Sequence, residues 1–146
     1  MPEQRLILLV EDNPDDAELT RLALQDGGLI NRVTWVQDGA EALVYLLGDG
    51  QGGEPGPLPE LVLLDLRMPR VGGLEVLRRM RADPRTALLP VVVLTTSDEE
   101  SDMVRSYQLG ANSYVRKPVD FDQFVWAVQQ LRMYWLVLNH GAPSRP

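Results

Sequence analysis

Residues 61–69 read LVLLDLRMP, in which four apolar residues run directly into Asp65. A continuous apolar run of this length, preceded by a Gly- and Pro-rich segment, indicates a strand that is buried on both faces of a parallel sheet. Asp65 would then lie at the end of the strand, on the edge at which open α/β sheets bind their ligands. Because aspartate is also common in turns, this residue alone does not establish a chemical role.

Four other short runs have the same character and alternate with helical patterns along the chain. A strand followed by a helix therefore occurs five times, and crossovers of this length require parallel strand pairing. The sequence predicts an α/β fold with a five-stranded parallel sheet and five helices. The expected strands are residues 6–10, 32–36, 61–65, 91–94 and 113–116.

The first helix is predicted to start at Asn13, which can cap it, with Pro14 in the first helical position. Leu19, Leu22 and Ala23 are expected to form its apolar stripe. The helix should end at the two glycines at positions 27 and 28.

The other helix starts carry similar signals. Three of them have a side-chain cap followed three residues later by Glu or Gln, which is the pattern of a capping box. The pairs are Asp38 and Glu41, Ser97 and Glu100, and Asp120 and Gln123. The first of these helices should end at Gly48, and the Gly- and Pro-rich segment 48–60 is predicted to be a long surface loop. The third helix has Leu74, Leu77 and Met80 as its apolar residues, and the last is expected to run from Phe121 to about Leu138.

The bulk composition limits the function classes. The chain has 146 residues, a formal net charge of -7 and no cysteine. This length favours one domain, the acidic balance argues against broad nucleic-acid or anionic-membrane surfaces, and the lack of thiols excludes thiolate chemistry. Apolar runs are too short for a membrane helix, so a soluble, cytoplasmic protein is expected.

Polar groups follow four of the predicted strands: Glu11 and Asp12, then Asp65, Thr95 and Lys117. In a parallel sheet these strand ends share one edge, so we expect the five side chains to converge. Three carboxylates suit a hard cation such as Mg²⁺. With a phosphoryl group added, Asp65 can attack phosphorus, while the metal, Lys117 and Thr95 each contact one phosphoryl oxygen.

These residues fall in four motifs: EDN at 11–13, LLDLRMP at 63–69, LTTS at 94–97 and YVRKP at 114–118. Together, with their order and spacing, they resemble the receiver domain of two-component response regulators, over about residues 5 to 138. The resemblance implies a CheY-like, flavodoxin-type doubly wound sheet of strand order 2-1-3-4-5. Residues 1–140 would form a single receiver domain with an extended last helix, and residues 141–146 a disordered tail.

The resemblance also implies roles for individual residues. Asp65 would accept the phosphoryl group from a histidine kinase. Mg²⁺ would be held by Asp12, Asp65 and the backbone carbonyl of Arg67, with Glu11 assisting through water. Two further implications concern the last strand: the Lys117–Pro118 bond would be cis, and Tyr114 would be the aromatic residue that turns inward as Thr95 moves to the phosphoryl group.

A narrower resemblance suggests a partner. The long Gly/Pro loop and the aromatic C-terminal region are similar to those of single-domain regulators paired with bacterial phytochrome kinases. The last helix also carries Trp126, Met133 and Val137 off the stripe of its expected core residues Phe124, Val125, Val128, Leu131 and Trp135. This predicts a homodimer through that helix, the helix at 99–109 and the last strand. The only histidine, His140, is interpreted as a bystander.

Two other functions use a similar sheet. A phosphatase of the haloacid-dehalogenase type also forms an aspartyl phosphate, but it needs an acid two residues later, where this chain has Arg67. A flavin-binding flavodoxin-like module needs a phosphate-binding loop after the first strand, where this chain has acids at 11, 12, 15 and 16. The favoured interpretation is a signalling domain that is not an enzyme beyond its own phosphotransfer and autodephosphorylation. A small Mg²⁺-dependent aspartyl-phosphate phosphatase, or a phosphate sink or relay without its own output, is the alternative.

Overall fold

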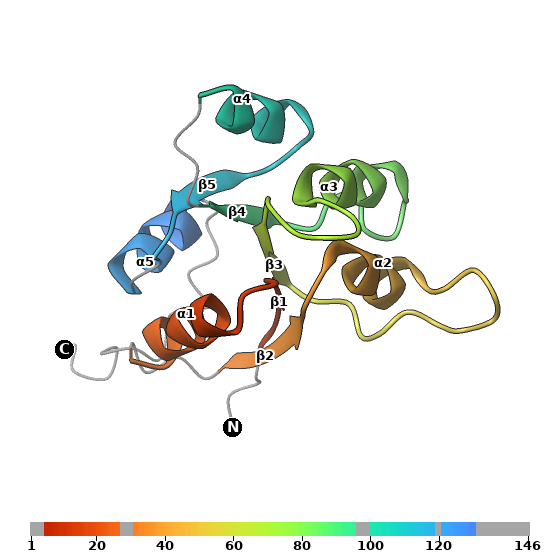
Figure 1. Cartoon of the computed structure of the whole chain (residues 1–146), viewed down its shortest axis with the longest axis horizontal. Coiled ribbons are helices and arrows are strands. Elements are labelled where there is room, and N and C mark those ends of the chain that lie inside the picture. Colours follow the sequence, from red (N-terminus) through yellow and green to blue (C-terminus); the bar gives the residue numbers. More distant parts are fainter. Residues whose placement is uncertain (1–4, 27–30, 96–99, 119–120, 131–146) are drawn as a thin grey trace.

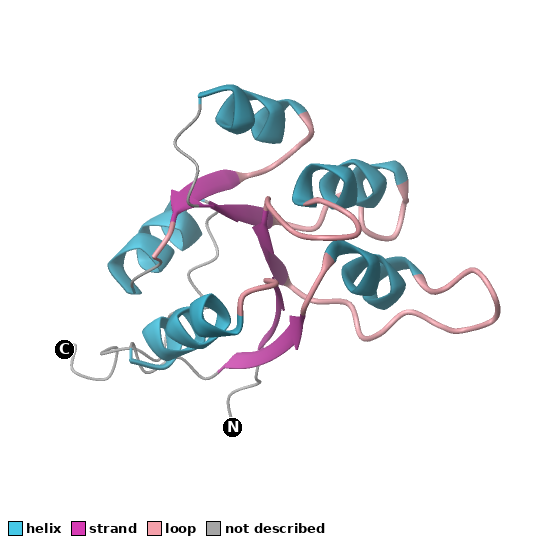
Figure 2. Cartoon of the chain, in the orientation of Figure 1, coloured by secondary structure: helices cyan, strands magenta, loops and turns pink. Residues whose placement is uncertain are grey.

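The computed structural model describes residues 5–26, 31–95, 100–118 and 121–130. In this part of the chain five parallel strands form one sheet in the order β2-β1-β3-β4-β5, and a helix follows each strand (Figures 1 and 2). The predicted fold class and strand order are therefore confirmed. The strands are β1 (Arg5–Val10), β2 (Asn31–Val36), β3 (Leu61–Asp65), β4 (Val91–Thr95) and β5 (Ser113–Arg116), and the helices are α1 (Pro14–Asp26), α2 (Gly39–Leu47), α3 (Gly73–Ala82), α4 (Glu100–Gln108) and α5 (Phe121–Gln130).

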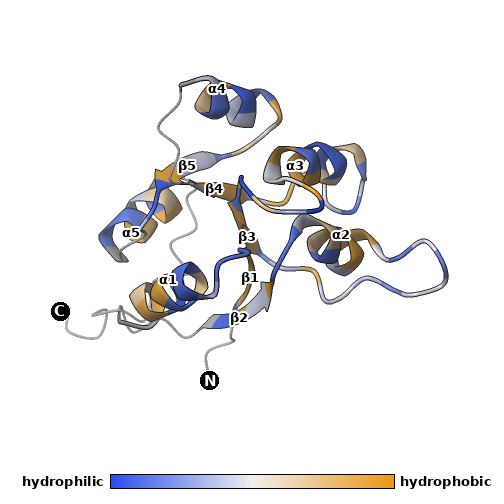
Figure 3. Ribbon diagram, viewed as in Figure 1, coloured by the Kyte–Doolittle hydropathy of each residue, from blue (hydrophilic) through white to orange (hydrophobic). Residues whose placement is uncertain are grey.

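The sheet separates two hydrophobic layers. Successive residues of a strand point to opposite faces, so Leu8 packs against α2 and α3 whereas Leu9 packs against α1 and α5. All residues of β3 and β4 are buried, as expected for strands covered on both sides. Figure 3 shows the central strands as apolar, between helices that carry both polar and apolar residues. Because all five strands are parallel, their carboxyl ends lie at one edge of the sheet.

Helix α1 starts as predicted, but its buried face differs from the expected one. The Asn13 side chain accepts hydrogen bonds from the backbone N–H groups of Asp15 and Asp16, at 2.8 and 3.1 Å. The face against the sheet consists of Ala17, Thr20 and Leu24, whereas Leu19 and Leu22 are exposed. The predicted stripe was wrong because hydropathy favoured the leucines, while the helix packs on the sheet through the small residue Ala17.

Helix α2 has the predicted cap in a modified form. Asp38 Oδ1 accepts a hydrogen bond from the Glu41 N–H at 2.7 Å, but Glu41 Oε1 accepts from the Gln37 N–H and not from that of Asp38. The helix ends at Gly48, and segment 48–60 is a loop without helix or strand, as predicted. This loop packs on α2 through Tyr45, whose hydroxyl donates to the Pro57 carbonyl at 2.8 Å.

The last helix is described as far as Gln130. Phe124 and Val128 are buried against the sheet, Val125 is half-buried, and Trp126 is 53% exposed. The predicted exposure of Trp126 is confirmed. The other expected features lie outside the described residues: the extension to Leu138, the tail, the Ser97 and Asp120 caps, and the side chains of Leu131, Met133, Trp135, Val137 and His140.

No helix in the described ranges has the length and apolar character needed to cross a membrane.

Candidate metal site at the carboxyl edge of the sheet

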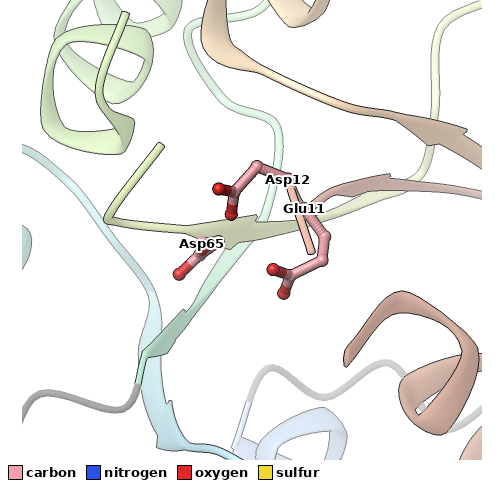
Figure 4. Close-up of side chains that lie close together, drawn as sticks. All are labelled: Glu11, Asp12 and Asp65. Atoms are coloured by element: carbon pink, nitrogen blue, oxygen red, sulfur yellow. The ribbon is translucent and has the colours of Figure 1, made fainter. Parts of the chain in front are cut away.

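Three carboxylates from two neighbouring strands lie together at the carboxyl edge. Glu11 and Asp12 directly follow β1, and Asp65 is the last residue of β3. One ligand oxygen of each lies within 4.8 Å of the others, and Figure 4 shows the three side chains side by side. A compact set of carboxylate oxygens is the donor set that Mg²⁺ takes in proteins. These residues therefore fit a divalent cation.

Lys117, which follows β5, reaches into this cluster from the other side. Its Nζ atom lies 2.7 Å from Glu11 Oε1, 3.0 Å from Asp16 Oδ2 and 3.6 Å from Asp65 Oδ1. Only 7% of the lysine side chain is exposed. Burial alone would lower the pKa of Lys117, but the hydrogen bond that it donates to Glu11, the charge of Asp65 and the hydrogen bond that it donates to Asp16 outweigh burial and raise this pKa. Lys117 therefore remains a buried cation.

Asp65 is the carboxyl group most strongly affected by its surroundings. Burial, followed by the negative charge of Glu11, raises its pKa to about 7, although Lys117 and the N–H of Arg67 act in the opposite direction. That N–H donates to Asp65 Oδ1 at 3.5 Å. Lys117 brings one positive charge to three carboxylates, so their negative charge is only partly compensated. A divalent cation would supply the missing positive charge.

Backbone contacts hold Glu11 in place. Its N–H donates to the Val36 carbonyl at 3.0 Å, and its carbonyl accepts from the Trp35 indole N–H at 2.7 Å. The Glu11 side chain accepts from the N–H of Asn13 at 3.2 Å. These bonds connect β1, β2 and the start of α1, so the acidic strand end has a defined position.

The end of β5 is held in a similar way. The Lys117 N–H donates to the Thr95 carbonyl at 2.9 Å, which fixes the lysine beside the end of β4. The Lys117–Pro118 peptide bond is cis, as the motif implied. Thr95 is fully buried at the last position of β4.

Loop 66–72 carries the residues immediately after Asp65, and contacts on two sides fix it. The Arg67 guanidinium forms an ion pair with Asp102 of α4 at 2.9 Å. Arg70, with φ of 71°, binds both carboxylate oxygens of Asp38 at 3.0 and 3.2 Å. A Cβ atom at Gly73 would lie 2.3 Å from the Asp65 carbonyl oxygen, so only glycine permits this approach of α3 to the site.

The structure therefore brings Glu11, Asp12, Asp65 and Lys117 together as predicted and places Thr95 on the same edge. No contact tests the Arg67 carbonyl as a metal ligand, so this stays a prediction. Tyr114 in β5 is half-buried against the core beneath α2 and α3. It also lines a cavity of about 420 Å³ with Val115, Arg116, Asp122, Gln123 and Trp126. Its proposed inward movement is not tested.

One residue in contact with this cluster was missed. Asp16 was considered only as one of the acids that follow the first strand, yet it pairs with Lys117. The available signal was its position: a helix that starts at the end of β1 carries its first turn over the same edge of the sheet.

Comparisons with known proteins agree with this geometry. The family model described as "Response regulator receiver domain" matches residues 7–129. The bacteriophytochrome response regulator AtBRR, whose structure is known, is 51% identical, with a TM-score of 0.81, and the alignment covers 94% of this chain and 99% of that one. The Mn²⁺-bound form of response regulator Rcp1, a protein of Synechocystis sp., is 36% identical, with a TM-score of 0.74 and coverage of 90% and 94%. A "Probable methanogenesis regulatory protein FilR2" of Methanothrix harundinacea is 43% identical over 93% of this chain and 86% of its own length.

Proposed function

Because the chain belongs to the response regulator receiver domain family, we propose that it is a single-domain response regulator that accepts a phosphoryl group on Asp65 from a histidine kinase. One observation carries this proposal. The buried carboxyl group of Asp65 lies beside two further acids and 3.6 Å from the Lys117 ammonium. This combination of a nucleophile, a cation site and a fixed positive charge suits phosphoryl transfer.

In the proposed reaction an Asp65 carboxylate oxygen attacks phosphorus. The bond between phosphorus and the donor imidazole nitrogen of the kinase breaks, the new oxygen–phosphorus bond gives an acyl phosphate, and the imidazole leaves with a proton from solvent. Lys117 stabilises negative charge on one phosphoryl oxygen, and the Thr95 hydroxyl donates to another. Asp12, Asp65 and the Arg67 carbonyl would hold Mg²⁺, with Glu11 assisting through water, and when bound the ion neutralises charge on a third oxygen.

The consequence of phosphorylation is proposed to be a shift between two surface conformations. Movement of Thr95 toward the phosphoryl group would leave space into which Tyr114 turns. Tyr114 lines the cavity beside Trp126, so this movement would change the surface formed by β5 and α5. Output would then pass through protein contacts. A phosphate sink or relay is the second candidate, and a small aspartyl-phosphate phosphatase the third.

The proposed partner is a sensor histidine kinase of the bacteriophytochrome class. The support is the 51% identity to the bacteriophytochrome response regulator AtBRR. We also propose a homodimer that uses α4, β5 and α5. Its support is the group of exposed apolar side chains on these helices, Met103, Val104, Tyr107 and Trp126.

Phosphotransfer from a purified bacteriophytochrome kinase with labelled phosphate tests the proposal. The wild-type protein and Asp65→Asn are compared in the presence of Mg²⁺, with Asp83→Asn as a control for the loss of one acidic charge away from the site. We expect label on the wild type and on Asp83→Asn and none on Asp65→Asn. Label retained on Asp65→Asn would place the acceptor elsewhere, and continuous phosphate release from a simple phosphomonoester would favour the phosphatase.

A further inference from the structure

Asp16 has no part in the proposed phosphotransfer, yet it binds the lysine of the site. It lies in the first turn of α1, its side chain is 32% exposed, and its Oδ2 atom is 3.0 Å from Lys117 Nζ. Among the described residues the carboxylates close enough to share a cation are Glu11, Asp12 and Asp65, so Asp16 lies outside that group. Its contact with the site is the lysine.

The distances from Lys117 Nζ show which carboxylates it contacts most closely. The ammonium has three N–H donors, and its two shorter contacts, at 2.7 and 3.0 Å, are with Glu11 and Asp16. Asp65, the proposed phosphoacceptor, is the most distant of the three acids at 3.6 Å. Glu11 and Asp16 thus hold the ammonium nearer to themselves than to Asp65, and a phosphoryl oxygen on Asp65 would compete with them for its charge.

The two acids differ in what happens to them when a cation is bound. Glu11 belongs to the metal cluster, so a divalent cation competes with Lys117 for its oxygens. Asp16 lies outside the cluster and keeps its negative charge available to Lys117. With the cation and the phosphoryl group both in place, Asp16 therefore remains as a competitor for the ammonium.

We propose that Asp16 is a positioning residue that holds the Lys117 ammonium on the α1 side. It thereby weakens the binding of a phosphoryl group that is carried by Asp65. This inference deepens the proposed function and rests on it. The phosphorylated state is then less stable than it would be without the contact of Asp16. The signal is therefore more readily reversed.

The simpler explanation is that Asp16 only complements the positive end of the α1 dipole. The chain offers a matched control for that explanation, because Asp15 is an acid in the same first turn. The Asp15 side chain is exposed and, within the described ranges, forms no ion pair with Lys117. Neutralising either residue removes the same charge from the same helix end, but only the change at Asp16 releases the lysine.

The test is a titration of the full chain with beryllium fluoride, a phosphoryl mimic, at saturating Mg²⁺, followed by tryptophan fluorescence. Asp16→Asn, Asp15→Asn and Asp16→Glu are compared with the wild type. We expect Asp16→Asn to bind the mimic at least about threefold more tightly than Asp15→Asn, and Asp16→Glu to return toward the wild-type affinity. A misfolded variant would lose binding, so a gain cannot arise from damage to the fold.

Equal affinities of Asp16→Asn and Asp15→Asn, or weaker binding by Asp16→Asn, would overturn the inference. The inference would also be overturned if Asp16→Glu bound the mimic as tightly as Asp16→Asn, because the position and not the carboxylate would then determine the affinity. If the wild type itself takes up no beryllium fluoride, the proposed function fails first. The wild-type titration thus separates failure of the proposed function from failure of the role of Asp16.

Discussion

The Nζ atom of Lys117 lies 3.6 Å from Oδ1 of Asp65, and at this distance the buried carboxyl group is only partly neutralised. Burial and Glu11 raise the pKa of Asp65 to about 7. The folded protein then keeps a proton on Asp65 up to about pH 7, whereas the unfolded chain loses it near pH 4. Stability is therefore expected to fall as pH rises through this interval when no cation is bound.

Asp65→Asn should remove this pH dependence. In buffer with a chelator at pH 8, we expect the variant to be more stable than the wild type by on the order of 2 kcal/mol, and at pH 4 the difference should nearly vanish. Urea unfolding of both proteins at the two pH values measures it. Addition of Mg²⁺ should reduce the difference at pH 8. Parallel pH profiles of the two proteins would show that Asp65 does not titrate in this interval.

Asp12→Asn should weaken Mg²⁺ binding, because Asp12 contributes an oxygen to the carboxylate cluster. We expect the affinity to fall by about tenfold or more, which is the range for removal of groups that support a metal site. The Trp35 indole donates to the Glu11 carbonyl, so its fluorescence should report a Mg²⁺ titration. Asp15→Asn is the control and should change the affinity by less than about threefold, since screened surface charge has a small effect. Equal effects of the two changes would place the cation elsewhere.

Gly73→Ala should destabilise the protein through backbone overlap at the site. The added Cβ would lie 2.3 Å from the Asp65 carbonyl oxygen, which cannot move without displacing the end of β3. We expect a loss of about 2 kcal/mol or more, as for overpacked interiors. The adjacent Gly72→Ala is the control, because its nearest contact would be 3.6 Å away, from the Leu66 carbonyl oxygen. Thermal unfolding compares the two, and a similar loss for both would mean that the approach of α3 is not the cause.

Much of the site could be predicted from the sequence because the parallel sheet converts distance along the chain into proximity. Glu11 and Lys117 are separated by 106 positions, yet each directly follows a strand. The positions of the strands were therefore enough to predict that the two residues lie close together. Local caps such as Asn13 were readable for a different reason. Their signal is contained within a few neighbouring residues.

What could not be predicted depends on the rotation of helices and the path of loops. The buried face of α1 is set by its packing on the sheet, so the leucines at 19 and 22 were assigned to the wrong side and the contact of Asp16 was missed. The ion pair between Arg67 and Asp102 likewise requires the exact course of loop 66–72. No periodic pattern in the sequence signals it.

The ion pair of Arg67 with Asp102 should affect the lifetime of the acyl phosphate more than the stability of the fold. The Arg67 side chain is exposed, and such pairs contribute about 0–1 kcal/mol. Asp102→Asn would remove this ion pair from the Arg67 guanidinium, which lies two residues from Asp65 and would then be drawn more strongly toward a phosphoryl group there, where it can shield it from water. We expect a longer lifetime for Asp102→Asn and a shorter one for Arg67→Ala, measured by loss of label after removal of the kinase. Glu75→Gln, which breaks the ion pair of Glu75 with Arg78 on α3, is the control and should leave the lifetime unchanged. Unchanged lifetimes in both test variants would separate this ion pair from the chemistry.

Trp126→Glu should weaken the proposed homodimer. Among the large apolar side chains of α4 and α5 whose burial the structure describes, Trp126 is the most exposed, and it lines the cavity beside Tyr114. Buried tryptophans contribute strongly to interfaces, and a carboxylate in the same place would have to lose its hydration, so we expect the dissociation constant to rise at least about tenfold. Sedimentation velocity over a range of concentrations, with and without beryllium fluoride, measures it. Leu88→Glu is the control, because Leu88 is even more exposed but lies in the segment between α3 and β4 and not on α4, β5 or α5, and it should dimerise like the wild type. A wild type that stays monomeric at high micromolar concentration in both conditions would rule out the dimer, and an equal effect of the two substitutions would rule out this face as the interface.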